Sequence, residues 1–331
     1  MNDFIAIGDI VIDAFIKLKD VRIDTDHDTG DQGMKEICFR FGDKVEYEDL
    51  LVVPAVGNSS NAAVAARRLG LKSALVTNIG DDEHGREDLR VLENEGVKTD
   101  FVKVHEGMQS NYHYVLRYGA ERTILVKHYE YPYKLEDIGN PKWIYLSSLA
   151  KNSISYHHEI ASYLKTHPST KLAFQPGTFQ IELGFEALKD VYEETEVFFC
   201  NVEEGEKILG MNTLGIEELL KRMRALGPQI VVITDGPKGA YAYDGQNIWS
   251  APMYPDLTPP VDRTGAGDSF SATFISALAL GYDIPTALLW GPINSMSVVR
   301  EIGAQKGLLN QEQIKKYLQE APIDFKIRKL K

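Results

Sequence analysis

The chain has 331 residues, 44% of them hydrophobic and 25% charged, and a formal net charge of −12 at pH 7, a composition typical of a globular protein with a large core. Apart from the short basic tail from Lys326 to Lys331, which we interpret as a solvated terminus, no cluster of Lys and Arg accompanies this acidic balance, which argues against a nucleic-acid partner. Because the sequence has no membrane-spanning stretch, no signal-peptide pattern, and no metal or disulfide spacing at Cys38 and Cys200, we expect a cytoplasmic protein without a membrane partner.

The chain begins with a short apolar run, Phe4 to Ile7, which is typical of a buried strand in a parallel sheet. Asp13 lies in the apolar segment that follows this run. A carboxylate just beyond the carboxyl end of a first strand lies where open α/β sheets bind their ligands. Asp13 is therefore a candidate for binding sugar hydroxyls, and the alternative is a solvent-facing acid on an extended segment.

The sequence from Lys19 to Lys44 is mostly polar. Its acidic run from Asp24 to Asp31 predicts a solvated loop, because no glutamate stands at the closing position of a calcium loop. Beyond that loop, Ile37, Phe39 and Phe41 alternate with polar residues. This alternation predicts a strand of a small sheet outside the main core.

The stretch Gly57-Asn58-Ser59-Ser60-Asn61 precedes a small-residue helix, Ala62 to Leu69. Ser and Asn are good helix caps, so a structural role accounts for much of this stretch. Asn58 and Asn61 also place two side-chain amides one turn apart, where they could donate to and accept from a polyol. Both interpretations stay open at this point.

Two alternating runs, Tyr112 to Tyr118 and Arg122 to His128, predict a hairpin around Gly119-Ala120-Glu121. With the segments near Asp13 and Ile37 they would make a four-stranded sheet, too small for its own core but of a suitable size for a lid. The three tyrosines of the first run share one face. Such a row is more often packing or an interface than a base-stacking site.

Beyond residue 133 the pattern changes to alternating strands and helices, which predicts a parallel sheet covered on both faces. The predicted strands are Trp143–Leu146, Lys171–Phe174, Val197–Cys200 and Gln229–Ile233. Two of them end in polar stretches, from Asn201 to Glu204 and from Thr234 to Gly239. Because parallel strands end at one edge of a sheet, a nucleotide could lie across both stretches.

The stretch from Asp262 to Asp268 reads Asp-Arg-Thr-Gly-Ala-Gly-Asp and runs into a small-residue helix that ends at Gly281. The first N–H groups of a helix lack internal partners and attract anions, such as a transferring phosphoryl group. Asp268 would lie in the first turn, where a carboxylate could accept the proton of an attacking hydroxyl. The alternative is a tight loop before a core helix with a stabilising first-turn acid.

These motifs resemble, in order, those of the ribokinase, or PfkB, family of carbohydrate and nucleoside kinases, and the resemblance covers nearly the whole chain. The stretch Asp262 to Asp268 is similar to the family's carboxy-terminal signature, with Arg263 in place of the usual Thr or Pro. Asn201 and Glu204 match its Asn-x-x-Glu motif, which implies that Glu204 helps to place magnesium and phosphate through water. The family's nucleotide-loop pattern, Thr-x-Gly-x-x-Gly, is matched by Thr234, Gly236 and Gly239.

Toward the amino end, Gly57 and Asn61 match the second Gly and the Asn of the family's Gly-Gly-x-x-x-Asn sugar-binding signature, with Val56 at the first Gly. Asp13 matches the family's acid near the first strand. Gln175 stands where many members have an Asp-Pro pair and is given no role. The resemblance therefore implies an acceptor site of Asp13, Gly57, Asn58 and Asn61, an ATP site of Asn201, Glu204, Thr234, Gly236, Gly239 and Asn294, and a monovalent-cation site bordered by Asp262 and Thr264.

The resemblance also implies a Rossmann-like α/β fold, with a mostly parallel sheet covered by helices on both faces and a small β-sheet lid. We expect an α/β domain of residues 1–12, 51–108 and 129–331, and a lid of residues 13–50 and 109–128. Many members pair lid against lid, so the apolar face around Ile37 suggests a homodimer.

The leading hypothesis is a kinase that uses ATP, Mg²⁺ and K⁺ to phosphorylate a hydroxymethyl group of a sugar. Asp268 would deprotonate the hydroxyl, and the N–H groups around Gly265, Ala266 and Gly267 would hold the negative charge. A nucleoside kinase of the same family is the first alternative, and a catalytically silent ligand-binding protein is the second. A nicotinamide dehydrogenase is disfavoured because no Gly-x-Gly-x-x-Gly follows the first strand.

Overall fold

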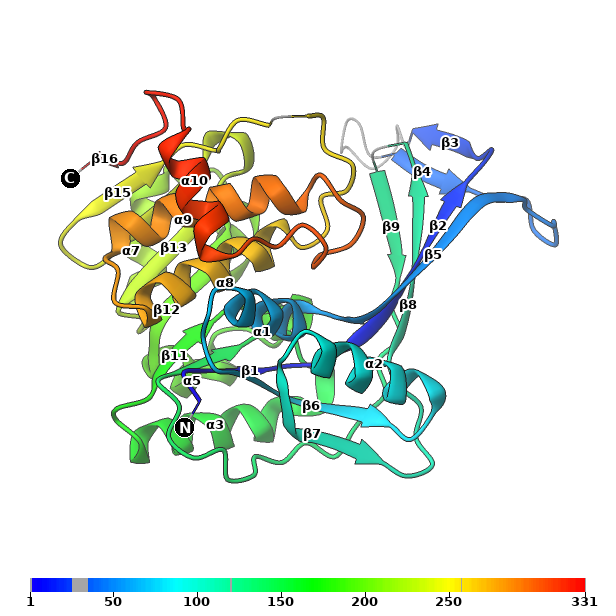
Figure 1. Cartoon of the computed structure of the whole chain (residues 1–331), viewed down its shortest axis with the longest axis horizontal. Helices are drawn as coiled ribbons and strands as arrows, with labels where there is room; N and C mark the ends of the chain where they lie inside the picture. The colour runs from blue at the N-terminus through cyan, green and yellow to red at the C-terminus, as the bar shows by residue number, and fades with distance from the viewer. Residues whose placement is uncertain (1, 26–34, 120, 257, 331) are drawn as a thin grey trace.

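A computed structural model describes residues 2–25, 35–119, 121–256 and 258–330, with a large central sheet and a smaller sheet that projects from it (Figure 1). The central sheet has ten strands in the order β16-β15-β14-β13-β12-β11-β10-β1-β6-β7. The strands from β13 to β7 are parallel, and β14, β15 and β16 form an antiparallel edge. Their bounds are β1 Phe4–Ile7, β6 Ser73–Gly80, β7 Lys98–His105, β10 Trp143–Leu146, β11 Lys171–Phe174, β12 Thr195–Asn201, β13 Ile230–Thr234, β14 Ala240–Tyr243, β15 Ile248–Ala251 and β16 Arg328–Lys329.

Helices cover both faces of this sheet, because the residues of its central strands point alternately to either side. In β1, Phe4 and Ala6 belong to one hydrophobic cluster, and Ile5 and Ile7 belong to the other. The first face carries α1 Asn58–Arg68, α2 Glu83–Asn94, α8 Ala266–Ala279, α9 Ile284–Val298 and α10 Gln311–Gln319. The second carries α3 Ile154–Thr166, α4 Thr178–Leu183, α5 Lys189–Glu193, α6 Val202–Leu209 and α7 Ile216–Ala225. The predicted α/β architecture is confirmed.

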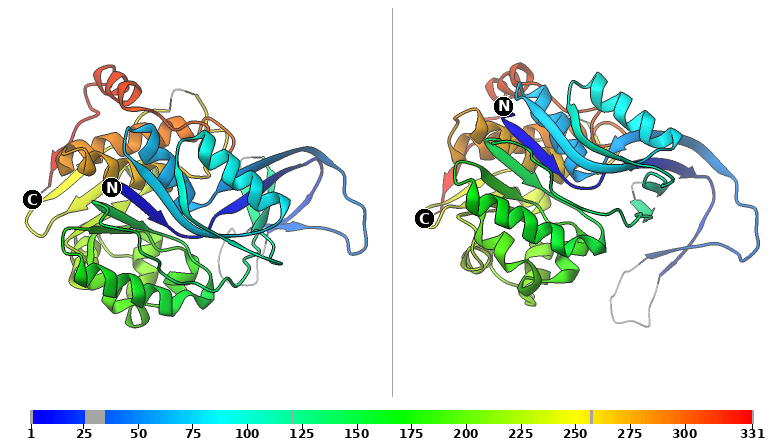
Figure 2. Two further views of the ribbon diagram at one scale, coloured as in Figure 1. Left: turned by 60° about the horizontal axis from the view of Figure 1, so that its bottom comes forward. Right: turned by 90° about the horizontal axis from the view of Figure 1, so that it is seen from below.

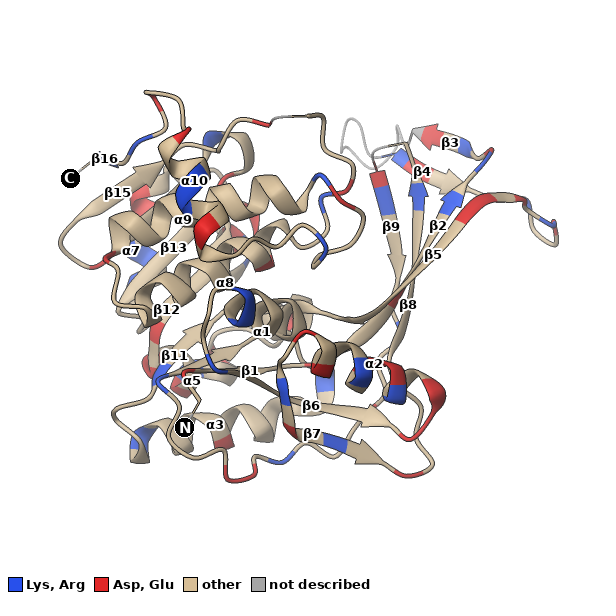
Figure 3. Cartoon of the chain, in the orientation of Figure 1, with Lys and Arg blue, Asp and Glu red and all other residues tan. Residues whose placement is uncertain are grey.

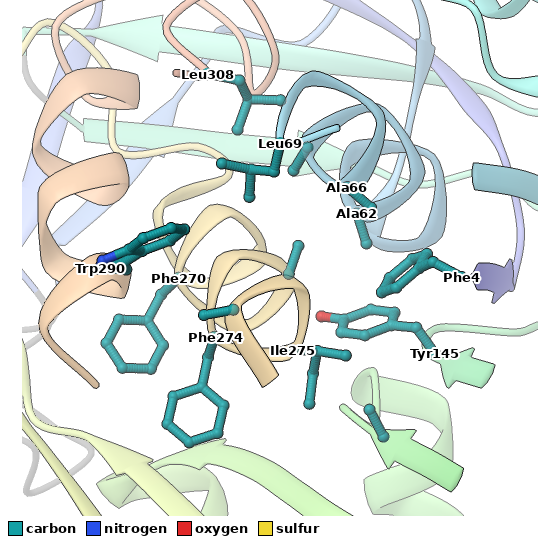
Figure 4. Close-up of a cluster of buried hydrophobic side chains, with 14 of the residues drawn as sticks. Phe4, Ala62, Ala66, Leu69, Tyr145, Phe270, Phe274, Ile275, Trp290 and Leu308 are labelled. Carbon is teal, nitrogen blue, oxygen red and sulfur yellow. The ribbon is translucent and has the colours of Figure 1, made fainter. Parts of the chain in front are cut away.

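The helix that follows the glycine-rich stretch, α8, is deeply embedded in the first face. Figure 4 shows Phe270, Phe274 and Ile275 of α8 pointing into the cluster that Trp290 of α9 also enters. Burial of each aromatic side chain contributes roughly 1.5–3 kcal/mol to folding. This packing fixes the start of α8 relative to α1 and the central strands.

A four-stranded lid sheet projects from the body (Figure 2) and has the strand order β5-β2-β8-β9. Strands β2 and β8 are parallel, and the other two pairings are antiparallel. The bounds are β2 Val11–Leu18, β5 Tyr47–Val56, β8 Tyr112–Tyr118 and β9 Glu121–Leu125. Asp13 pairs with His113 of β8 and with Val53 of β5. This register places the three side chains in one row on the same face of the lid sheet.

The predicted composition of the lid is wrong in one strand. The fourth strand is β5, whereas the segment near Ile37 forms β4 Lys35–Cys38, which pairs with β3 Arg22–Thr25 as a separate hairpin. The stretch from Leu50 to Val56 is apolar and can pair with β2 over its length, while β4 ends before Phe39. Strand β5 also crosses the expected domain boundary at residue 50. Most of the predicted acidic loop lies outside the described residues.

Over the described ranges, no helix combines the length and the apolar character that crossing a membrane requires. Lys and Arg are interspersed with Asp and Glu along the ribbon (Figure 3). Cys38 and Cys200 are free thiols, as the sequence predicts.

A buried carboxyl group holds the segment that leads from the lid into α1. Asp88 of α2 is 0% exposed and accepts a 2.7 Å hydrogen bond from the backbone N–H of Ala55, whose φ is 57°. Its Oδ2 has no hydrogen-bond partner among the described residues. Burial raises the pKa of Asp88 well above its ordinary value of 3.8.

This pKa makes the stability of the protein depend on pH. The folded state holds the Asp88 proton more tightly than the unfolded state, so the contribution to stability is complete below pH 3.8 and is lost as pH rises through the folded pKa. We expect Asp88→Asn to gain stability over the wild type with rising pH, by up to about 1.4 kcal/mol per pH unit. Urea unfolding of both proteins between pH 5 and 8 measures this difference, and a difference that does not change with pH would contradict it.

Candidate active site

The amino terminus of α8 is built around a glycine that no other residue can replace without strain. Gly265 has a φ of 78°, and a side chain there would collide with Ala304. The left-handed turn lets the chain enter α8 at Ala266, and the Ser269 N–H closes the first turn on the Gly265 carbonyl at 2.9 Å. The N–H groups of this first turn, together with the positive end of the helix macrodipole, suit an anion.

Asp268 lies in that first turn and is held by three side-chain amides from two other parts of the chain. Its Oδ1 accepts from Asn58 Nδ2 at 2.8 Å and from Gln175 Nε2 at 3.3 Å, and its Oδ2 accepts from Asn61 Nδ2 at 2.8 Å. The residue is only 8% exposed. Burial raises the pKa of Asp268, and the amide donors oppose this rise because they favour the ionised form.

The predicted acceptor residues gather on the lid side of Asp268. Asp13 of β2 is buried, and its charge adds to the rise in the pKa of Asp268. Gly57 precedes α1 with a φ of 112°, and a Cβ there would lie 2.7 Å from the carbonyl oxygen of Asp9. The turn at Gly57 therefore brings Asn58 and Asn61 to the carboxyl end of β1.

A cavity of about 270 Å³ lies on the other side of α8. The predicted nucleotide-loop residues line it together with Ala266 and Gly267, so the cavity reaches the first turn of α8. Its remaining walls are mainly apolar, as expected for a nucleobase and ribose. The lining residues are Thr234, Gly236, Pro237, Gly239, Ala240, Met253, Asp256, Pro260, Arg263, Ala266, Gly267, Phe270, Pro292, Ser295, Met296 and Val299.

Asn201 and Glu204 form a reciprocal cap at the start of α6. The Glu204 N–H donates to Asn201 Oδ1 at 2.8 Å, and the Asn201 N–H donates to Glu204 Oε2 at 2.9 Å. Burial raises the pKa of Glu204, and the charge of Asp268 adds to this rise. Asn201 pairs with Thr234 in the sheet, so both motifs end at the same sheet edge. The motif can therefore cap α6 and still lie beside the predicted nucleotide loop.

Three predicted residues lie within internal networks. The amide of Asn294 is fully buried, donates to Thr273 Oγ1 and accepts from the N–H of Leu309. Neighbouring residues of α9 line the cavity, whereas Asn294 itself does not. Asp262 accepts from both the N–H and the hydroxyl of Thr264, and its second oxygen accepts from the N–H of Gly303. These contacts brace the loop that precedes α8.

Sequence reasoning missed several polar residues at this site. Gln175, which was given no role, follows β11 and reaches Asp268, and the Tyr145 hydroxyl donates to its Oε1. His113 lies beside Asp13 because the two residues pair across β2 and β8. The position of Gln175 after a core strand was the available signal, since its strand ends at the same edge as β1.

Comparisons with known proteins identify relatives of this chain. A model of the pfkB family of carbohydrate kinases matches residues 33–311. The ribokinase of Bacillus subtilis (strain 168) is 29% identical over 273 residues, which cover 79% of this chain and 87% of that protein. The nucleoside kinase of Methanocaldococcus jannaschii is 24% identical over 274 residues, which cover 81% of this chain and 86% of that protein.

Among solved structures, Arabidopsis thaliana ribokinase complexed with ribose and ATP matches with a TM-score of 0.80 at 18% sequence identity, over 96% of this chain and 99% of that chain. This likeness confirms the predicted ribokinase fold. The chain belongs to the pfkB family of carbohydrate kinases and is a phosphotransferase with an alcohol acceptor, a sugar or nucleoside kinase.

Proposed function

We propose that the protein transfers the γ-phosphoryl group of ATP to a hydroxymethyl group of a sugar. The observation that carries the proposal is the position of the Asp268 carboxylate, at the amino terminus of α8, between the cavity and the acceptor residues around Asp13. The similar ribokinase fold, solved with ribose and ATP, supports this choice of reactants. A nucleoside is the alternative acceptor, supported by the nucleoside kinase relative.

In the proposed mechanism, Asp268 accepts the proton of the acceptor hydroxyl as its oxygen attacks the γ-phosphorus. The N–H groups of Gly265, Ala266 and Gly267 stabilise the negative charge on the transferring phosphoryl group. The apolar cavity walls hold the nucleoside part of ATP and keep its phosphates directed at α8. The lid excludes water, which would otherwise compete as an acceptor.

The donor set fits a Mg²⁺ ion that is held mostly by the nucleotide. In the described part of the chain, no three His, Cys, Asp or Glu side chains gather as a metal-binding group. Mg²⁺ commonly binds through one or two carboxylates, waters and substrate phosphates. Glu204, whose pKa is raised by burial and by the charge of Asp268, would supply such a carboxylate through water. The bound ion would neutralise developing charge on the phosphates. We assign Asp262 and Thr264 to the border of a K⁺ site.

We also propose that the protein is a cytoplasmic homodimer that pairs through its lids. On the lid face opposite to Asp13, Val52, Tyr114 and Leu125 lie in one cross-strand row and are between 44% and 51% exposed. A second row contains Leu50, which is 46% exposed. Such an apolar face on a projecting sheet favours contact with a second copy.

The first prediction from the proposed function concerns Asp268 as the base. Asp268→Asn keeps the size of the side chain, but its NH2 group cannot accept the proton and loses a hydrogen bond from a neighbouring amide donor, so we expect kcat to fall by about 10²- to 10⁴-fold. ATP binding, measured by calorimetry, should change little. Glu203→Gln, which neutralises an exposed acid at the start of α6, is the control and should keep its activity. Near-normal turnover of Asp268→Asn with sugars or nucleosides would contradict the assignment of Asp268 as the base.

The second prediction concerns pH. The base acts only when ionised, so kcat/KM should fall as pH decreases through the raised pKa of Asp268, on a limb that lies above pH 3.8. Gln175→Leu removes a hydrogen bond that favours the carboxylate, so this limb should move to higher pH. A pH–rate profile of both proteins measures the shift. A limb that stays in place or moves to lower pH would contradict the role of Gln175.

The third prediction concerns assembly. Light scattering coupled to size exclusion should find a dimer for the wild type and a monomer for the double variant Val52→Lys, Tyr114→Lys, because charged side chains would replace the apolar contact. Val104→Lys, at an exposed site on β7 outside the lid, is the matched control and should leave the dimer intact. A monomeric wild type contradicts the lid pairing.

A further inference from the structure

Two carboxylate–imidazole pairs lie side by side next to the acceptor residues. His113 Nδ1 lies 3.5 Å from Asp13 Oδ1, and His128 Nδ1 lies 3.2 Å from Asp9 Oδ2. The two imidazole rings are tilted against each other with centroids 5.1 Å apart. All four side chains are at most 13% exposed. The mechanism proposed above uses Asp13 alone among them.

Two hydrogen-bond donors converge on the carboxylate of Asp9. The Tyr133 hydroxyl lies 2.8 and 2.9 Å from the two oxygens of Asp9, and burial followed by the charge of Asp9 raises the pKa of Tyr133, so this hydroxyl stays a donor. His128 Nδ1 is the second donor to the same carboxylate. In the neutral ring, Nε2 of His128 is therefore the lone-pair acceptor.

His113 has the same orientation toward its carboxylate. With Nδ1 directed at Asp13, its Nε2 is an acceptor in the neutral ring. This Nε2 atom is buried and has no hydrogen-bond partner among the described residues. A buried polar atom without a partner is costly, and a ligand hydroxyl would relieve that cost.

The histidine pair is connected to the catalytic carboxylate on both sides. Asp13, the partner of His113, acts on Asp268 through its charge. His128 contacts the edge of Phe179, with ring centroids 5.7 Å apart, and Phe179 follows shortly after Gln175, which donates to Asp268. These contacts place the pair beside Asp13, on the acceptor side of Asp268, and we call the pair with Asp13 the histidine wall.

With both imidazole rings neutral, the groups that this wall offers are hydrogen-bond acceptors. They are the Asp13 carboxylate and the Nε2 atoms of His113 and His128, whereas the amide donors of Asn58 and Asn61 are engaged by Asp268. Hydroxyl groups can donate to such a wall, but a phosphate or carboxylate group cannot.

Arg117 and Arg122 lie too far along the lid to change this conclusion, and the Lys127 ammonium lies over the Tyr129 ring, 4.9 Å from its centroid. Arg117 and Arg122 are paired across β8 and β9, and Arg117 is four residues beyond His113 on β8, about 13 Å along the strand. Figure 3 shows the basic positions of β8 and β9 toward the far end of the lid. Arg117 also donates to the carbonyl of Val261 at 3.1 Å.

We propose that His113 and His128, together with Asp13, bind adjacent hydroxyl groups of a neutral polyol acceptor and select against acceptors that carry an anionic group. The two histidines are specificity-determining residues of the kinase site, and their role rests on the function proposed above. The acceptor class is thereby a neutral sugar, a cyclic polyol or the sugar part of a nucleoside.

Steady-state kinetics with ribose, fructose, myo-inositol, adenosine and fructose 6-phosphate test the proposal. We expect phosphorylation of at least one neutral acceptor and a lower kcat/KM for fructose 6-phosphate than for that acceptor. His113→Leu should raise the KM for the neutral acceptor by about 10-fold or more, because the wall loses a hydrogen bond. The KM for ATP should stay within about threefold, and His113→Asn should recover part of the loss. His158→Leu, at an exposed histidine of α3, is the control.

A binding measurement separates this proposal from the kinase function. In the wild type, the imidazole ¹⁵N signals of His113 and His128, assigned with the variants, should shift when the neutral acceptor is added. Shifts without turnover would support the histidine wall and contradict the kinase proposal. Turnover with an unchanged acceptor KM in His113→Leu, or a preference for fructose 6-phosphate, would overturn the wall. Neither shifts nor turnover with the neutral acceptors would overturn both.

Discussion

The hydrogen bonds that hold the buried carboxylate of Asp268 are the interaction on which the site depends. Burial disfavours the ionised form that a base requires, and three amide donors compensate for part of this effect. Asn58 and Asn61 come from α1, Gln175 follows β11, and Asp268 begins α8. The carboxylate can therefore be ionised and correctly oriented only when these three parts of the fold are packed together.

The rest of the fold supplies that packing. The aromatic residues of α8 fix its first turn against the body, and the left-handed glycines Gly57 and Gly265 let α1 and α8 begin at the carboxyl edge of the sheet. Behind Asn61, the Gln305 amide donates to Asn61 Oδ1 at 3.1 Å and to the carbonyl of Ala55. A second set of contacts thus orients the residues that contact Asp268. In physical terms the Asp268 carboxylate is preorganised, as the proposed proton transfer requires.

Much of this arrangement could be predicted from the sequence. Apolar runs at β1, β10 and β11 predict core strands, and the Gly-Ala-Gly-Asp stretch predicts the start of α8, because the period of the pattern and the glycine chemistry are local. The fourth lid strand could not be predicted, since the pairing of β5 with β2 depends on contacts between distant segments rather than on alternation at Ile37. The contacts of His113 and His128 were missed for the same reason. Each depends on a neighbour that only strand order and register bring close.

A crystal structure with a non-hydrolysable ATP analogue and the preferred acceptor would test the central claim most directly. The account predicts the γ-phosphate at the N–H groups of Gly265, Ala266 and Gly267, and the acceptor hydroxymethyl oxygen about 2.6–3.2 Å from a carboxylate oxygen of Asp268. The other acceptor hydroxyls should lie against Asp13 and His113. An acceptor that binds with no hydroxyl near Asp268, or a nucleotide whose phosphates lie away from α8, would contradict the account.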